Sequence, residues 1–280
     1  MSGKSTFFSK YKELQYVGSF LVLIILFSGC SEYNQVLKGD DYNTKFNLAN
    51  SLFDEQDYFR SIALYEQIYQ RMPKTGQGEL AYYRIARGYF EEEDYEMSGY
   101  YFGSFNQRFP YSTKLEEALF MSALCSVYNS PEHTLDQGET QLAINNLQQF
   151  VDAYPKSSLI DSCNRVMDRL RYKLELKDYD AVKLYAKTEN YRAAVTSALT
   201  FIEEYPLSGF SEEIQFILLK NAYLLGINSV EDKKCERIEQ AIERYRTFVI
   251  LFPNSAHKTE SDQIHIKAQK EWELSCSMKK

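Results

Sequence analysis

The chain has 280 residues, of which 44% are hydrophobic and 15% aromatic, yet it contains only 12 Gly and 6 Pro. This composition is sufficient for a large buried core and favours helices over a loop-rich fold. The formal net charge is −7, and without a basic patch to pair with phosphates, binding to nucleic acid and electrostatic adhesion to anionic lipid are both disfavoured.

The N-terminus has the pattern of an export signal. A basic segment with three lysines precedes an apolar run over residues 20–27, which ends at Ser28-Gly29-Cys30. The run is well short of the roughly 20 residues that a membrane-spanning helix needs, so a cleaved signal peptide is favoured over an uncleaved anchor. Small residues directly before a cysteine resemble the bacterial lipobox, in which the cysteine thiol is lipidated. The alternative is an ordinary thiol at the end of a signal peptide.

We therefore predict three segments: a lipoprotein signal peptide over residues 1–29, a lipidated N-terminus and tether over 30–41, and a repeat domain over 42–280. Several acyl chains on Cys30 would give stable anchoring, so the protein would meet the membrane through its lipid anchor only. Removal of the signal peptide takes away three lysines and one glutamate and changes the formal net charge from −7 to −9.

Five of the six prolines mark a repeated helix boundary. Each follows a large apolar residue, and four of the five continue as Pro-x-Ser. A proline just past a helix end, followed by a hydroxyl residue able to cap the next helix, stops one helix and starts another. Five such stops predict at least five helical units. The dipeptides are Met72-Pro73, Phe109-Pro110, Tyr154-Pro155, Tyr205-Pro206 and Phe252-Pro253.

Between these prolines the residues resemble the tetratricopeptide consensus, most clearly in the second unit. There, small residues at Ala86 and Ser98 would let two antiparallel helices approach closely, while aromatic residues fill the space between hairpins. The resemblance predicts an all-α fold, a right-handed superhelical stack of about five hairpins with a C-terminal capping helix. The expected repeats span 42–73, 79–110, 115–155, 175–206 and 212–253, followed by the capping helix over 259–273.

No catalytic or metal-binding constellation is recognisable in the sequence. The three histidines, His133, His257 and His265, have no metal-ligand spacing. The acidic run over residues 91–94 lacks the ligand spacing of a calcium loop and is better interpreted as a solvated turn. We therefore expect no enzymatic activity, no metal and no cofactor.

The cysteines after Cys30 are too few and too scattered for a disulfide-rich miniature fold. Cys125 and Cys163 lie in apolar helical stretches, where a free cysteine packs as a small hydrophobic residue. For Cys235 and Cys276, either a disulfide or two free thiols fits the sequence.

A candidate peptide-binding groove lies on the inner helices of the first two repeats. Arg84 and Arg87 are three residues apart and share a face, so two guanidiniums beside Asn50 can bind a peptide carboxylate and an adjacent aromatic side chain. In the alternative interpretation both arginines form ordinary salt bridges with residues 91–93 or with Glu117, which stands where a carboxylate clamp has a lysine. The candidate residues, assigned outside the hairpin-packing positions, are Phe46, Asn47, Asn50, Phe53, Tyr83, Arg84, Arg87 and Phe90.

The lipobox, the five hairpins, the Pro-x-Ser turns and a long tyrosine-rich helix that starts at Arg169-Leu170 together resemble the BamD family, lipoproteins of the outer-membrane β-barrel assembly machine. The resemblance implies an outer-membrane location on the periplasmic face. It also implies binding of a BamA-type β-barrel subunit through the C-terminal repeats, contact with other components of the machine, and binding of unfolded outer-membrane protein substrates in the N-terminal groove.

Two other classes of protein remain open at this stage. Another periplasmic repeat lipoprotein, acting as an adaptor in envelope division, pilus or secretion assembly, would share the same architecture. A cell-wall enzyme that uses the repeats only for docking would need a catalytic constellation that this sequence lacks.

Overall fold

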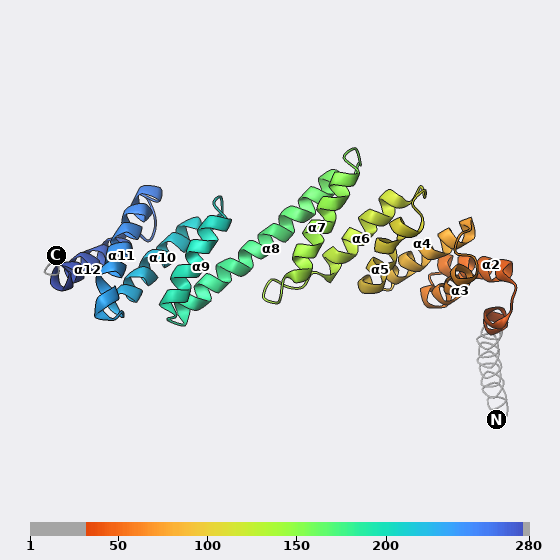
Figure 1. Cartoon of the computed structure of the whole chain (residues 1–280), viewed down its shortest axis with the longest axis horizontal. Helices are drawn as coiled ribbons and strands as arrows, with labels where there is room; N and C mark the ends of the chain where they lie inside the picture. The colour runs from red at the N-terminus through yellow and green to blue at the C-terminus, as the bar shows by residue number, and fades with distance from the viewer. Residues whose placement is uncertain (1–31, 277–280) are drawn as a thin grey trace, which may run out of the picture. The chain divides into compact units, whose positions relative to one another are not determined.

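The structure is a computed structural model that describes residues 32–276. Within these residues every element is a helix, which confirms the all-α prediction (Figure 1). Cys30 and the predicted signal peptide lie outside the described residues. The helices are α2 (Tyr42–Asp54), α3 (Tyr58–Arg71), α4 (Gly76–Glu91), α5 (Tyr95–Arg108), α6 (Leu115–Asn129), α7 (Gly138–Ala153), α8 (Ile160–Lys187), α9 (Tyr191–Glu204), α10 (Ser211–Ile227), α11 (Glu231–Leu251) and α12 (Lys258–Ser275).

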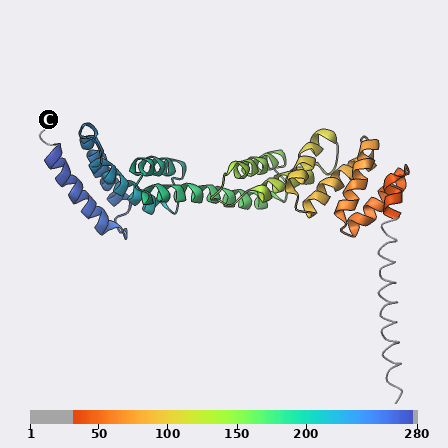
Figure 2. The same ribbon diagram turned by 90° about the horizontal axis from the view of Figure 1, so that it is seen from below.

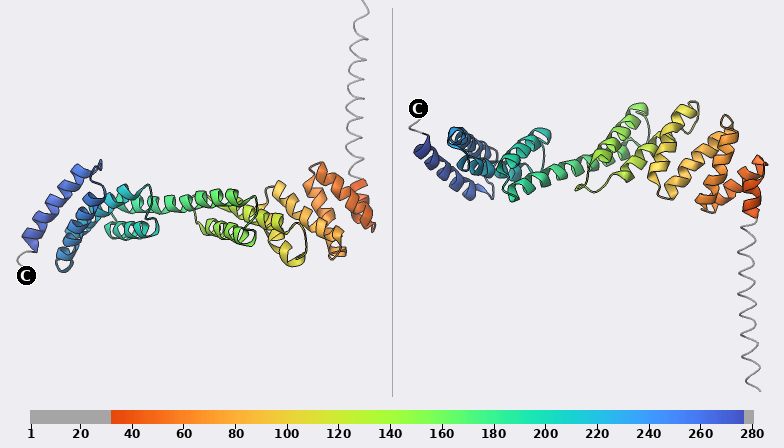
Figure 3. Two further views of the ribbon diagram at one scale, coloured as in Figure 1. Left: turned by 90° about the horizontal axis from the view of Figure 1, so that it is seen from above. Right: turned by 60° about the horizontal axis from the view of Figure 1, so that its bottom comes forward.

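The described chain forms two compact units. One contains residues 32–129 and 145–156, and the other contains residues 130–144 and 157–276, so that one of the three points of division falls within α7. In the first unit, α2 pairs with α3 and α4 with α5, and α6 packs on α5 (Figures 1 and 2). In the second, α8 pairs with α9 and α10 with α11, and α12 packs against α11 (Figure 3).

Three hairpin turns use the same local device. The residue before the helix-capping position has a positive φ, between 58° and 65°, which reverses the chain direction, and the next residue caps the second helix of the hairpin with its side chain. The positive-φ residues are Gln56, Glu93 and Glu189, and the caps are Asp57, Asp94 and Asn190.

Small residues let the two helices of a hairpin approach each other closely. Ser98 Oγ donates to the Ala86 carbonyl oxygen at 2.9 Å, and Ser61 Oγ donates to the Ala49 carbonyl oxygen at the same distance. All four residues are fully buried. The backbone of one helix is therefore within hydrogen-bonding reach of the side chains of the next, as the repeat pattern predicts.

The serines of the Pro-x-Ser motifs do not act as helix caps, which corrects the expectation from the sequence. Thr75 caps α4 by accepting from the Gly78 N–H at 3.1 Å. Each serine instead accepts from the backbone N–H two residues later, as Ser112 does from Lys114 at 3.1 Å. The motif thus builds a hydroxyl turn before the helix; the other serines in this role are Ser157, Ser208 and Ser255.

The segment expected to be a tether is partly helical. Residues 32–38 form a helix, and Tyr33, Val36 and Leu37 pack against the core of the first hairpin. The buried Lys45 ammonium donates to the Leu37 carbonyl oxygen at 3.0 Å. Although its sequence shows little periodicity, this segment is held by a few apolar contacts and one buried charge.

Helix α8 also differs from the expected fourth repeat, because it begins at Ile160 and has 28 residues. Its early turns bury Cys163, Met167 and Leu170, which follow a helical spacing.

Of the four described cysteines, Cys235 and Cys276 form a disulfide that joins the start of α11 to the end of α12. Cys125 and Cys163 are free and buried, as expected for core residues.

Candidate functional site

The residues that α2 supplies to the candidate groove surround one buried tyrosine of α3. Tyr65 donates its hydroxyl hydrogen to Asn50 Oδ1 at 2.6 Å. The rings of Phe46 and Phe53 meet the Tyr65 ring edge to face, each at a centroid distance of 6.4 Å, and burial raises the pKa of Tyr65 to about 12. Asn47 is exposed beside them. These contacts fix the α2 face in one arrangement.

Arg84 connects α4 to the end of α2. Its guanidinium lies 4.2 Å from the centroid of the Phe53 ring, and Nη1 is 3.7 Å from Asp54 Oδ1. The Asp54 side chain is 74% exposed, so this ion pair is long and solvated and contributes little to stability. Arg84 is thus positioned mainly by the aromatic ring, and the expected pairing with residues 91–93 or with Glu117 is not the one observed.

Arg87 is held more firmly. Its Nη2 lies 2.9 Å from Glu91 Oε1, one turn further along α4. Its Nη1 contacts the Met121 sulfur at 3.8 Å. Arg87 therefore forms the ordinary salt bridge with the acidic turn that the alternative interpretation predicts.

Tyr83 is a correction to the predicted groove. It was assigned outside the packing positions, but it is only 6% exposed and packs edge to face on Phe102 and Phe105. Burial raises its pKa, and the neighbouring Glu117 carboxylate raises it further. The ring of Tyr83 therefore belongs to the core, where Lys114 Nζ also covers it at 4.6 Å.

Phe90 contacts two tyrosines that the sequence did not identify as part of the site. Its ring meets those of Tyr95 and Tyr128 at 5.4 and 5.7 Å, and these two tyrosines stack at 4.6 Å. Tyr128 is 54% exposed. The spacing of Glu117, Met121 and Tyr128 along α6 places them on one helical face, and this spacing was the signal that could have identified Tyr128.

The candidate site therefore consists of two half-buried arginines on α4, an amide and two aromatic rings on α2, and an aromatic group at the α6 end. Such a surface can pair with a carboxylate and accept an apolar or aromatic side chain. In residues 32–276 no group of His, Cys, Asp and Glu side chains has the arrangement of a metal site. Nor does any helix in the described part of the chain have the length and apolar character to cross a membrane.

Comparison with known proteins gave one family and several solved structures. The family model YfiO, described as an outer membrane lipoprotein, matches residues 40–238. No curated protein matches significantly.

Among solved structures, a tetratricopeptide-repeat protein (BF2334) of Bacteroides fragilis NCTC 9343 is 14% identical with a TM-score of 0.36, covering 83% of this chain and 100% of that chain. The thermophilic tetratricopeptide-repeat protein TTC0263 of Thermus thermophilus is 14% identical with a TM-score of 0.32, covering 81% of this chain and 98% of that one. Both TM-scores are low, and the hairpins described above are themselves the evidence for the fold.

Proposed function

Because the chain belongs to the YfiO family of outer membrane lipoproteins, we propose that it is a non-enzymatic component of the β-barrel assembly machine. In this role it binds the BamA-type subunit and helps to assemble and insert β-barrel proteins into the outer membrane. We further propose that it is attached on the periplasmic face through lipid on Cys30.

The family match is the observation on which the proposal depends. It covers residues 40–238, and so includes helices α2 to α10 completely and the first part of α11. Consecutive hairpins of this kind act as scaffolds for other proteins. The half-buried arginines and aromatic rings on α2 and α4 support a role in holding a peptide, because their chemistry suits a carboxylate beside an apolar side chain.

Purification from the native membrane tests this function. A chain tagged at its C-terminus, solubilised in mild detergent, is expected to copurify a β-barrel subunit with soluble periplasmic domains in stable proportion. Depletion of the chain is expected to reduce the amount of folded, heat-modifiable barrel proteins in the outer membrane.

Two results would contradict the proposal. If barrel proteins assemble normally after depletion, the chain does not serve the assembly machine. If the copurified partners are instead components of a division, pilus or secretion apparatus, the chain is an adaptor for that apparatus.

A further inference from the structure

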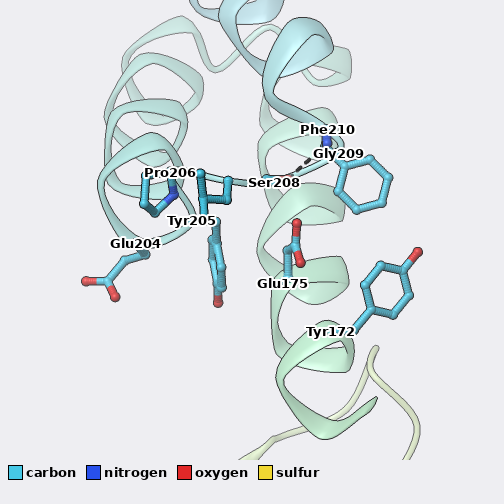
Figure 4. Close-up of a pocket in the computed structure, with 9 residues that line it drawn as sticks. Tyr172, Glu175, Glu204, Tyr205, Pro206, Ser208, Gly209 and Phe210 are labelled. Atoms are coloured by element: carbon cyan, nitrogen blue, oxygen red, sulfur yellow. Dashed lines mark hydrogen bonds between the residues drawn. The ribbon is translucent and has the colours of Figure 1, made fainter. Parts of the chain in front are cut away.

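A cavity of about 550 Å³ lies at the end of the hairpin of α8 and α9, the fourth of the predicted repeats, within the second compact unit (Figure 4). Helix α8 contributes Tyr172 and Glu175, and the remaining lining comes from residues 204–210, which include the end of α9 and the Pro-x-Ser turn. The turn residue Leu207 is 98% exposed at its rim.

Aromatic rings form the walls of this cavity. Phe210 stacks on Tyr179 at 4.1 Å and on Tyr172 at 6.3 Å. Tyr205 donates its hydroxyl hydrogen to Asp178 at 2.7 Å, so its ring is fixed. In Figure 4 the Glu175 carboxylate lies between Tyr205 on one side and the Tyr172 and Phe210 rings on the other.

The carboxylate of Glu175 is uncompensated, unlike its counterparts in other hairpins. Glu79 of the second hairpin, which stands 14 residues before the positive-φ turn residue as Glu175 does, accepts from Ser112 Oγ at 2.6 Å. Glu212 of the fifth hairpin accepts from Ser255 Oγ at 2.6 Å. Within residues 32–276, Glu175 has no hydrogen-bond or ion-pair partner, although Ser208 stands at the matching position.

A second residue of the cavity carries a negative charge where the second hairpin, formed by α4 and α5, carries a positive one. There the equivalent cavity contains Arg108 and Lys74, and Arg108 donates to the Tyr69 hydroxyl at 2.7 Å. Counted from the hairpin turn, Glu204 occupies the position of Arg108. The cavity of the fourth hairpin thus holds two carboxylates, whereas the cavity of the second hairpin holds one carboxylate together with an arginine and a lysine.

Three of the four lysines of α8 donate to other groups, and the fourth, Lys187, stands 12 residues and more than three helical turns beyond Glu175. Lys173 donates to the Pro131 carbonyl oxygen at 2.7 Å, and Lys177 donates to that of Leu135 at 2.6 Å. Lys183 donates to the Tyr179 hydroxyl at 3.0 Å. Since these three ammonium groups are bound to other atoms and Lys187 is distant along the helix, the cavity has room and charge for a cation from outside.

We propose that this cavity binds the side chain of an arginine or lysine in a partner polypeptide, with an adjacent apolar residue of that polypeptide on Leu207 and Tyr172. A cation beside a carboxylate and over aromatic faces gains both a charge-assisted hydrogen bond and a cation–π contact. Arginine fits better than lysine, because its planar guanidinium can stack on the rings while it donates to Glu175. The inference does not depend on barrel assembly, since it concerns only this cavity and a basic peptide.

Calorimetric titration of the full chain in detergent tests the inference. The probe is the capped peptide acetyl-Gly-Leu-Arg-Leu-Gly-amide, compared with the same peptide carrying citrulline, which keeps the shape of arginine without its charge. We expect the citrulline peptide to bind about tenfold more weakly or worse, as for the loss of one charge-assisted hydrogen bond. Glu175→Gln is expected to weaken binding of the arginine peptide by a similar factor.

Glu203→Gln is the matched control, because Glu203 is an exposed neighbour on α9 that does not line the cavity. It makes the same charge change and should leave the affinity unchanged. Circular dichroism before titration verifies that both variants are folded. The inference is overturned if the arginine peptide does not bind at millimolar concentration, if citrulline binds equally well, or if the two glutamine variants behave alike.

Discussion

The two arginines of the candidate groove differ in how firmly they are held, and this difference gives a prediction. Arg87 is fixed by Glu91 at 2.9 Å, whereas the ion pair of Arg84 with the exposed Asp54 is 3.7 Å long. A peptide carboxylate can therefore replace Asp54 as the partner of Arg84 with little loss of free energy. We expect Arg84→Ala to weaken binding of a C-terminal barrel peptide by about tenfold or more, and Arg87→Ala to weaken it less.

The free-acid and amide forms of the same peptide provide the control, measured by titration against the chain. The amide should bind weakly to the parent and to both variants, because it lacks the carboxylate. Equal affinity across all combinations of peptide and variant would contradict binding of the peptide carboxylate by the two arginines.

Ala86 gives a second prediction at this scale. It is fully buried, and its carbonyl oxygen accepts from Ser98 Oγ at 2.9 Å, so no space remains for a larger side chain. We expect Ala86→Leu to lower the free energy of unfolding by about 1–3 kcal/mol through overpacking, measured by thermal or denaturant unfolding. Ala153→Leu, at an exposed position in α7, should change it little; identical melting of both variants would show that the hairpin register is wrong.

The sequence predicted Ala86 and Ser98 as close-contact residues because the repeat consensus requires small side chains there. It misassigned Tyr83, whose spacing fits either the groove or the core. Only the neighbours in three dimensions decide: Phe102 and Phe105 of α5 enclose the Tyr83 ring, while Tyr128 of α6 remains half exposed. Periodicity within one helix does not report which neighbouring helix covers a given face.

At the level of whole helices, the start of α4 depends on one glycine. A Cβ added at Gly78 would lie 2.0 Å from the Met72 carbonyl oxygen, which is backbone and cannot yield, whereas a Cβ at Gly76 would meet nothing within 4 Å. We expect Gly78→Ala to lower the free energy of unfolding by about 1–3 kcal/mol or more. Gly76→Ala should stay within about 0.5 kcal/mol of the parent, and equal stability of the two variants in denaturant unfolding would refute the close approach of α3 and α4.

The disulfide between Cys235 and Cys276 attaches α12 to α11 across a sequence separation of 41 residues. Closing a loop of this length restricts the unfolded chain, which on the chain-entropy model stabilises the fold by about 4 kcal/mol. We expect reduction, or the Cys235→Ser and Cys276→Ser double change, to increase amide hydrogen exchange in α12 most strongly. Exchange in α2–α5, which contain no cysteine, serves as the internal control. Unchanged exchange in α12 would show that the disulfide does not stabilise this helix.

Helix boundaries were less predictable than helix identity. The prolines located the end of each hairpin because Pro cannot continue a helix, but they did not locate the start of α8. That helix extends back to Ile160 because its early apolar residues find partners, and the consensus alone does not require those turns. The Pro-x-Ser serines were predicted as caps on residue type, whereas their distance from the helix start allows only a turn.

For the whole molecule, the repeated pattern predicted an all-helical chain because every hairpin needs the same small and aromatic positions. It did not predict the division into two compact units, since one of the points of division falls inside α7, where the helical pattern is uninterrupted. The Cys235–Cys276 pairing was equally open, because two thiols 41 residues apart pair only if the folded helices bring them together.

The attachment of the molecule to its membrane gives the last prediction. The sequence places Cys30 three residues before Tyr33, and Tyr33 donates its hydroxyl hydrogen to the Arg60 carbonyl oxygen at 3.3 Å. If Cys30 is lipidated, the anchor therefore holds the first hairpin directly at the membrane surface rather than on a long free tether. We expect Cys30→Ala to accumulate as a precursor that retains residues 1–29, detected by mass spectrometry of the membrane fraction. Cys163→Ser, which removes a thiol buried in α8, should still mature. Normal maturation and membrane fractionation of Cys30→Ala would show that the thiol of Cys30 is not the point of attachment.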